Sequence, residues 1–135
     1  MNSLYLLDTC VVSDYFKKNP KTIHHFQSVA PYQLHISMVT VMEVEFGLKL
    51  NPEREKKLRP LWEALLLLII VIPFDRADAS AAALIRAKMK PAGNMIGPYD
   101  LLLAGTAFQR KFIFVTSNSK EFKRLPELQL QDWRL

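Results

Sequence analysis

Short apolar runs that end abruptly at polar side chains are the clearest pattern in this chain. Residues 4–7, Leu-Tyr-Leu-Leu, run directly into Asp8, and residues 112–115, Phe-Ile-Phe-Val, run directly into Thr116. Apolar sequence without alternation is typical of strands that are covered on both faces, as in parallel sheets. Similar runs predict further strands at residues 33–37 and 69–74 and an edge strand at residues 128–130.

Between these runs, apolar residues recur at helical spacing and capping residues mark the helix starts. Thr9 is expected to cap the first helix, and Asn19 and Pro20 to separate it from the second. The expected helices span residues 10–16, 21–28, 39–50, 52–66, 77–89 and 99–107, with a short one around Glu121. Strands that alternate with helices predict an α/β fold. We therefore expect a single three-layer α/β/α domain over residues 1–135, with a mostly parallel central sheet of four to five strands.

Composition narrows the class of protein further. The 135 residues are 50% hydrophobic and 23% charged, which is typical of one globular domain. The single cysteine, Cys10, excludes a disulfide framework and a cysteine zinc site, and no histidine has the H-E-x-x-H spacing. Residues 64–74 are the most apolar segment, but they are fewer than the ~20 of a membrane-spanning helix. We interpret them as a buried helix end that continues into a strand. The N-terminus lacks signal-peptide features, so a cytoplasmic protein with no membrane segment is expected.

A formal net charge of +5 favours a polyanionic partner. If several carboxylates gather in one site, the remaining surface is more basic than this total suggests. Arg86, Lys88 and Lys90, at the end of an expected helix, are candidate RNA contacts. The same residues also complement the dipole of a helix C-terminus, and a solvated, slightly basic surface explains the net charge equally well.

Four polar groups occupy equivalent places in the expected fold. Asp8 follows the first strand, and Glu43 lies about one turn into the helix after the second. Asp100 lies in the first turn of a nearly all-apolar helix, and Asn118 and Glu121 follow the strand at 112–115. Each alone is explained as a helix cap or a solvated side chain. In a parallel sheet, however, all of them lie at the edge where such folds bind ligands.

This set contains oxygen donors but no cysteine or histidine, which suits Mg²⁺ or Mn²⁺ rather than zinc. Clustered carboxylates repel one another unless a cation lies between them. Mg²⁺ is typically held by one or two carboxylates together with phosphate oxygens of a substrate. The pattern therefore predicts phosphate-ester hydrolysis in which a metal-bound water is the nucleophile.

Four segments of the chain resemble the signature segments of PIN domains, and the similarity is closest to the VapC toxins of bacterial toxin–antitoxin pairs. They are Leu6–Thr9, Thr40–Gly47, Ile96–Ala104 and Val115–Phe122. The resemblance spans nearly the whole chain. The ending, Leu125–Trp133, is similar to that of the VapC group that cuts initiator tRNA.

This resemblance implies a Mg²⁺- or Mn²⁺-dependent endoribonuclease that acts on RNA, with tRNA as the expected substrate. It also implies a homodimer that a cognate antitoxin protein holds inactive. The implied catalytic residues are Asp8, Glu43, Asp100 and Glu121, of which Asp8 and Asp100 are the expected metal ligands. Supporting polar roles fall to Thr9, Thr116 and Asn118. Glu121 lies where many members have Asp or Glu, and Glu45 matches a variable position outside the site.

Two other classes compete with this interpretation. A catalytically silent RNA-binding or partner-binding module could share the fold, since fold alone does not fix function. Against it, a pure RNA binder gains nothing from carboxylates that face a phosphate backbone. A phosphotransfer protein fits poorly, because a receiver domain needs a second acidic residue beside Asp8, and an aspartate-based phosphatase needs an Asp where Cys10 stands.

Overall fold

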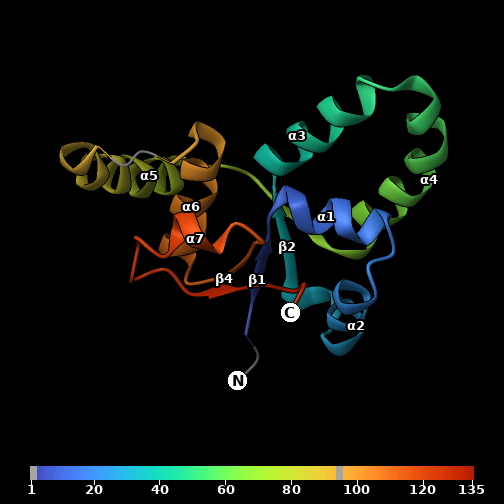
Figure 1. Cartoon of the computed structure of the whole chain (residues 1–135), viewed down its shortest axis with the longest axis horizontal. Helices are drawn as coiled ribbons and strands as arrows, with labels where there is room; N and C mark the ends of the chain where they lie inside the picture. The colour runs from blue at the N-terminus through green and yellow to red at the C-terminus, as the bar shows by residue number, and fades with distance from the viewer. Residues whose placement is uncertain (1–2, 94–95) are drawn as a thin grey trace.

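The computed structural model describes residues 3–93 and 96–135, and in this part of the chain the strands form one parallel sheet (Figure 1). The strands are β1 (Tyr5–Leu7), β2 (Leu34–Ser37), β3 (Ile70–Ile72), β4 (Ile113–Val115) and β5 (Leu130–Gln131). They lie in the order β3-β2-β1-β4-β5, with every neighbouring pair parallel. The carboxyl ends of all these strands therefore meet at one edge, with β1 in the centre.

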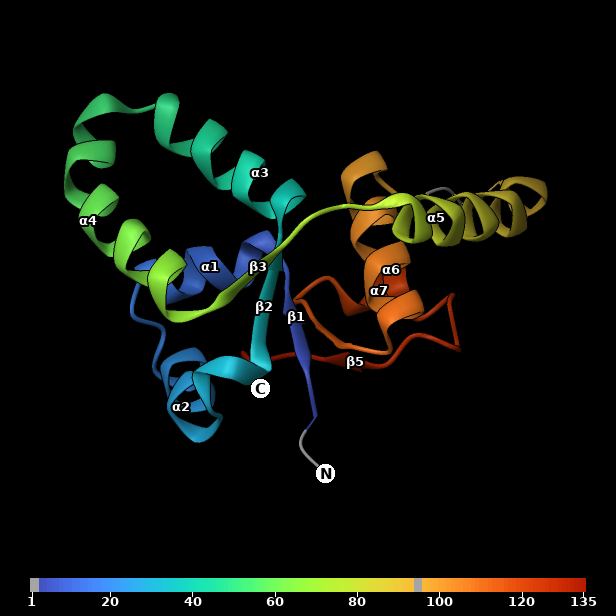
Figure 2. The same ribbon diagram turned by 180° about the vertical axis from the view of Figure 1, so that it is seen from behind.

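Helices cover both faces of the sheet, which confirms the predicted three-layer α/β/α fold (Figures 1 and 2). The helices that pack on one face are α1 (Thr9–Phe16), α2 (Pro20–Ser28), α3 (Met38–Lys49) and α4 (Pro52–Leu68). Those on the other face are α5 (Arg76–Met89), α6 (Pro98–Arg110) and α7 (Ser119–Phe122). Two short 3-10 helices, Pro31–Gln33 and Lys90–Ala92, complete the described elements.

The burial of the central strand, β1, on both faces explains why its sequence is continuously apolar. Leu6 and Leu7 are both inaccessible to solvent, yet they belong to different cores. Leu6 packs with Phe114 on the α6 face, whereas Leu7 packs with Val12 and Trp62 on the opposite face. Because successive side chains of a strand point to opposite faces, a strand covered on both sides needs an apolar residue at every position.

Capping side chains set most helix starts as the sequence predicts. Asn19 accepts hydrogen bonds from the first turn of α2, and Ser37 from that of α3. The first helix differs from the prediction, because Asp8 rather than Thr9 is its N-cap residue. The Asp8 carboxylate accepts the Thr9 amide hydrogen bond, so α1 begins one residue earlier than expected.

Two predictions about apolar segments are wrong. The end of α4 is not buried, since Leu67 is 90% and Leu68 50% exposed. The helix packs instead through Trp62 and Leu65, which lie on its inner face. The last edge strand covers Leu130 and Gln131 rather than residues 128–130, because Leu128 turns into the core. No helix of the described residues is long and apolar enough to cross a membrane.

A buried ion pair and a close backbone contact fix α6 against α5. Asp78 is fully buried and accepts hydrogen bonds from Gln109 and from the Nε and Nη2 atoms of Arg110, at 2.7, 3.1 and 3.0 Å. In the same interface, a Cβ atom added to Gly105 would lie 2.7 Å from the backbone nitrogen of Ala82. The two helices thus approach more closely than a side chain larger than glycine would allow. Because α6 carries Asp100, this packing also fixes the position of that residue.

Candidate active site

Asp8 lies at the carboxyl end of β1, where its backbone and side chain are both held in place. Its amide donates to the carbonyl of Val115 on β4 at 2.9 Å. The carboxylate is only 6% exposed; Oδ1 accepts from the Thr9 amide and Oδ2 from the Thr116 hydroxyl, each at 2.7 Å. Burial raises the pKa of Asp8, although these hydrogen bonds oppose the shift. The carboxylate is therefore oriented but costly to keep ionised without a cation.

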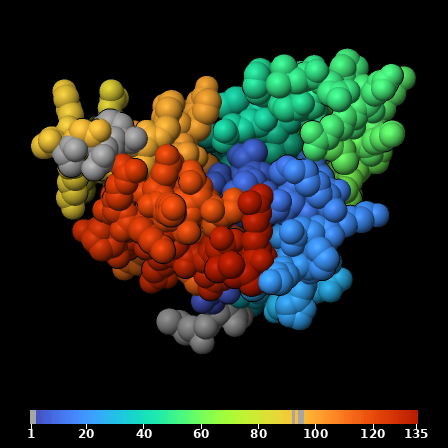
Figure 3. Space-filling view, in the orientation of Figure 1, coloured from blue at the N-terminus to red at the C-terminus, as the bar shows by residue number. Residues whose placement is uncertain are grey.

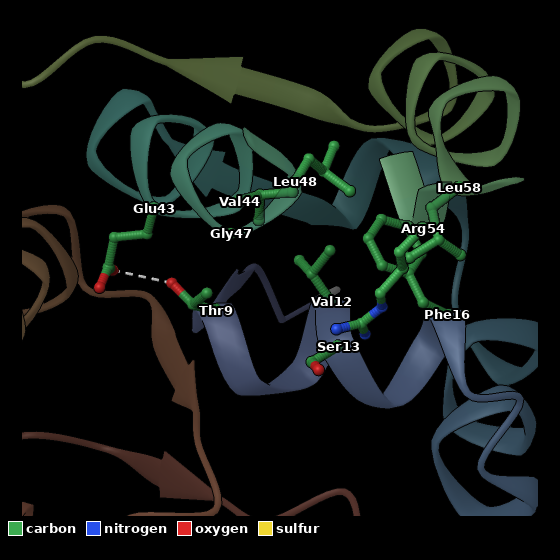
Figure 4. Close-up of a pocket in the computed structure, with 10 residues that line it drawn as sticks. All are labelled: Thr9, Val12, Ser13, Phe16, Glu43, Val44, Gly47, Leu48, Arg54 and Leu58. Atoms are coloured by element: carbon green, nitrogen blue, oxygen red, sulfur yellow. Dashed lines mark hydrogen bonds between the residues drawn. The ribbon is translucent and has the colours of Figure 1, made fainter. Parts of the chain in front are cut away.

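Glu43 reaches the same region from α3. Its Oε1 atom accepts a 2.8 Å hydrogen bond from the hydroxyl of Thr9, the residue that follows Asp8 (Figure 4). This bond joins the second turn of α3 to the first turn of α1. Thr9 therefore serves both carboxylates, with its amide on Asp8 and its hydroxyl on Glu43.

Asp100 lies in the first turn of α6, after an N-cap glycine that provides no side-chain cap. Partial burial raises the pKa of Asp100 to about 6, and the negative charges of Asp8, Glu121 and Glu43 add to the shift. No described residue donates a hydrogen bond to this carboxylate in the structure. Because the charges of the other three act on Asp100, the four predicted carboxylates lie in one region of the structure.

The polar residues that follow β4 complete the arrangement. Thr116, which is fully buried, donates to Asp8 and accepts from the Asn118 amide at 3.0 Å. The Asn118 side-chain amide donates to Oε2 of Glu121 at 2.8 Å. The structure thus brings Thr9, Thr116 and Asn118 to the carboxylates, each bonded to at least one member of the predicted set.

Cys10 also lies in this region, although its sequence position predicted no role at the site. Its Sγ atom lies 3.7 Å from Oδ2 of Asp8 and 4.0 Å from Oγ1 of Thr116, and it accepts from the Ser117 amide at 3.4 Å. Burial and the charge of Asp8 raise the pKa of this thiol. The sequence feature that could have placed Cys10 at the site is its position two residues after Asp8, in the first turn of the same helix.

Two groups of charged residues lie apart from the carboxylates. Arg86, Lys88 and Lys90 lie at the end of α5 that extends away from the sheet (Figure 1), and Lys88 is 4.0 Å from Glu127. Glu45, excluded from the predicted site, accepts from Arg59 at 2.7 and 2.9 Å and from Trp62 at 2.7 Å. The Arg59 guanidinium lowers the pKa of Glu45 to about 2, so this carboxylate joins α3 to α4.

A groove opens beside the Thr9–Glu43 pair, between α1, α3 and α4 (Figure 4). Its lining is largely apolar: Val12, Phe16, Val44, Leu48 and Leu58. Glu43 lies at one end, and Arg54 extends into the other. The carboxylates are thus flanked on the α1 side by an apolar surface.

The donor set fits a divalent cation held by few protein ligands. Among the described residues, no three His, Cys, Asp or Glu side chains are placed so that they could hold a metal ion. Mg²⁺ does not require three, since one or two carboxylates with water and phosphate oxygens are usual. Asp8 and Asp100 supply two carboxylates whose pKa values are raised by burial, and a bound cation would offset this cost of ionisation.

Asp100 is expected to make the metal-free protein less stable as the pH rises from about 4 to about 6. Its pKa is raised on folding, so the folded protein binds more protons than the unfolded chain in this interval, and stability falls as those protons leave. Asp100→Asn should flatten the fall. Thermal unfolding followed by circular dichroism in EDTA, at a series of pH values, measures it. An equally steep fall in the variant would assign the effect to other groups.

The fold and the acidic edge of the sheet define a parallel α/β protein with clustered carboxylates, and comparison with known proteins identifies its family. The PIN domain family matches residues 5–128. The tRNA(fMet)-specific endonuclease VapC of Shigella flexneri is 32% identical over 96% of this chain and 97% of its own. The protein of the same name from Salmonella typhimurium is 30% identical with the same coverage.

Solved structures give the same result. The DNA-bound VapBC structure from Salmonella typhimurium superposes with a TM-score of 0.86 at 30% identity, over 98% of this chain and 99% of the other. The DNA-bound VapBC2 structure from Rickettsia felis has a TM-score of 0.87 at 27% identity, over 96% and 98%. The chain belongs to the VapC family of PIN-domain proteins. The resemblance and fold predicted from the sequence are thereby confirmed.

Proposed function

We propose that this protein is a divalent-metal-dependent endoribonuclease, the toxin of a toxin–antitoxin pair, and that it hydrolyses phosphodiester bonds in tRNA. The observation that carries the proposal is the convergence of Asp8, Glu43, Asp100 and Glu121 at one sheet edge, where burial and the charges of the other three carboxylates raise the pKa of Asp100. A binding module for a phosphate backbone has no use for such a cluster, whereas a metal-dependent nuclease requires one.

In this mechanism Asp8 and Asp100 hold Mg²⁺ or Mn²⁺, which supplies Lewis-acid stabilisation of phosphate charge and activation of water. The Thr116 hydroxyl and the Thr9 amide fix the orientation of Asp8. Thr9 occupies only Oε1 of Glu43. No described residue donates to the second oxygen, Oε2, which leaves it available to take a proton from the attacking water. Asn118 orients Glu121 in the same way, through one carboxylate oxygen.

Charge distribution supports a polyanionic substrate. The formal net charge is +5 overall, so the chain outside the four clustered carboxylates carries +9. Most of the other acidic side chains, such as Asp14, Glu45 and Asp78, already pair with arginine. A basic exterior around an acidic centre attracts a nucleic acid and lets a cation join its phosphate to the carboxylates.

The relatives support the finer points of the proposal. Two of them are named as tRNA(fMet)-specific endonucleases, which supports tRNA as substrate and action in the cytoplasm. Toxin–antitoxin complexes are among the matching structures, which supports a cognate antitoxin as partner. The homodimer implied by the family resemblance stays a prediction.

Removal of the metal is expected to abolish cleavage. Purified, antitoxin-free protein should cut an initiator tRNA transcript with Mg²⁺ or Mn²⁺ and leave it intact in EDTA, with activity restored when excess Mn²⁺ is added. Asp100→Asn should stay inactive under every condition, because it lacks one of the two proposed ligands. The products are separated on denaturing gels.

Two outcomes would contradict this function. Cleavage that persists in EDTA would exclude the metal mechanism. Absence of cleavage by a folded, Mn²⁺-supplied sample, across total RNA as well as the transcript, would favour the catalytically silent binding module. Circular dichroism of the same sample shows whether the protein is folded.

A further inference from the structure

Two lysines, one in α7 and one at its C-cap, lie beside the carboxylates and form no ion pair within the described part of the chain. Lys120 and Lys123 are exposed, and they flank Glu121, whose charge acts on Asp100. The helix is anchored by Phe122, which is fully buried and packs edge-to-face on Phe114 at 4.9 Å. With Phe122 directed inward, the two lysines occupy the solvent side of α7. The segment around α7 forms a broad part of the molecular surface on this face (Figure 3).

The two flanks of the carboxylates are therefore chemically different. On the α1 side lies the largely apolar groove lined by Val12, Val44 and Leu48, where the donors are the hydroxyls of Thr9 and Ser13 and the guanidinium of Arg54. On the α7 side, cationic side chains begin within two residues of Glu121. A phosphate moved from water onto an apolar surface loses hydration without replacement, whereas one beside a lysine gains a charge partner and releases a counterion.

We infer that the RNA strand crosses α7, that Lys120 and Lys123 bind phosphates next to the scissile bond, and that the groove between α1, α3 and α4 does not hold substrate. This inference rests on the proposed ribonuclease function and names the surface that serves it. It also moves the predicted RNA contact from Arg86, Lys88 and Lys90 to residues adjoining the carboxylates. The lysines offset the repulsion between the substrate and the acidic cluster, so their contribution is to substrate capture rather than to the chemical step.

The test removes two lysines from one flank at a time. Lys120→Gln with Lys123→Gln removes the proposed contacts. Lys56→Gln with Lys57→Gln, on exposed positions of α4, is the matched control with the same loss of charge. The value of kcat/KM for the initiator tRNA transcript is measured over a series of KCl concentrations at fixed Mn²⁺, with kcat from saturating substrate. Thermal unfolding of each variant verifies that the fold is unchanged.

For the α7 pair we expect kcat/KM at low salt to fall roughly 10-fold with kcat nearly unchanged. The plot of log kcat/KM against log salt should become shallower by about 1.4, since each phosphate contact to a single strand contributes about 0.7. The α4 pair should keep the wild-type slope, because a mere change of net charge does not remove a defined phosphate contact.

The outcomes separate this inference from the proposed function. A folded wild-type protein that cuts no RNA overturns the proposed function itself. Wild-type cleavage with an unchanged slope in the α7 pair overturns the inference alone. A shallower slope in the α4 pair, with the α7 pair unchanged, overturns it in favour of a strand that crosses the opposite flank.

Discussion

Asp8→Asn is expected to lower the rate of RNA cleavage by about 100-fold or more while the protein stays folded. The substitution keeps the shape of the side chain but removes the charge that is proposed to hold the cation. It leaves an acceptor for the Thr9 amide, and the Thr116 hydroxyl can turn to accept from the new amide group. Relief of repulsion towards Asp100 offsets what is lost in these bonds. We therefore expect the unfolding free energy in EDTA to change by less than about 1 kcal/mol.

Asp14→Asn provides the matched control for this experiment. Asp14 is as buried as Asp8, but it accepts two hydrogen bonds from Arg134 at 2.7 and 3.0 Å instead of facing the other carboxylates. Its substitution should lower thermal stability and leave kcat unchanged. Activity of the Asp8 variant within a few fold of wild type would refute the ligand role. A large loss of stability in EDTA would show that the ionised Asp8 is needed for folding rather than for the cation.

The carboxylate set could be predicted from the sequence because its position follows from the order of strands and helices along the chain. An apolar run that ends in Asp8 predicts a buried strand, and a parallel sheet gathers the ends of such strands at one edge. The same reasoning placed Glu43 and Asp100 there, although they come from helices far apart in the chain. Pattern alone thus located the edge of the sheet and the identity of its acidic residues.

The contacts that orient those residues could not be predicted in the same way. Whether Thr9 bonds to Glu43, or Cys10 approaches Thr116, depends on how closely α1, α3 and β4 pack. The periodicity of apolar residues along the chain does not contain this information. The same limit applies to the pairing of Glu45 with Arg59, since only the angle between α3 and α4 brings them together.

The exposure of the end of α4 could not be predicted from the sequence for a different reason. Leu67 and Leu68 belong to a run of apolar residues, but a run without period does not show which side chains face the core. The RNA contacts predicted at the end of α5 stay a prediction. Arg86, Lys88 and Lys90 form a basic run at the end of that helix, and closeness along the chain does not show how near these residues lie to Asp8.

Gly105→Ala is expected to destabilise the protein by about 1–3 kcal/mol and to lower the thermal midpoint by roughly 5–10 °C. By helix propensity alone, alanine should stabilise the interior of α6 by about 1 kcal/mol. The new Cβ atom, however, would lie 2.7 Å from the Ala82 nitrogen and 2.8 Å from its Cα. These are backbone atoms of a packed helix, so α5 and α6 would have to separate, and Asp78 would lose part of its buried bonding to Arg110.

Gly47→Ala separates propensity from packing in this test. Gly47 lies inside α3, and a Cβ atom there would meet nothing within 4 Å, so alanine should stabilise by about 0.8–1.0 kcal/mol. Thermal and urea unfolding of both variants give the two free energies with opposite signs. Because α6 also carries Asp100, the Gly105 variant should need more Mn²⁺ for half-maximal cleavage at temperatures where it is still folded. Stabilisation by both alanines would mean that α5 and α6 lie farther apart than the structure places them.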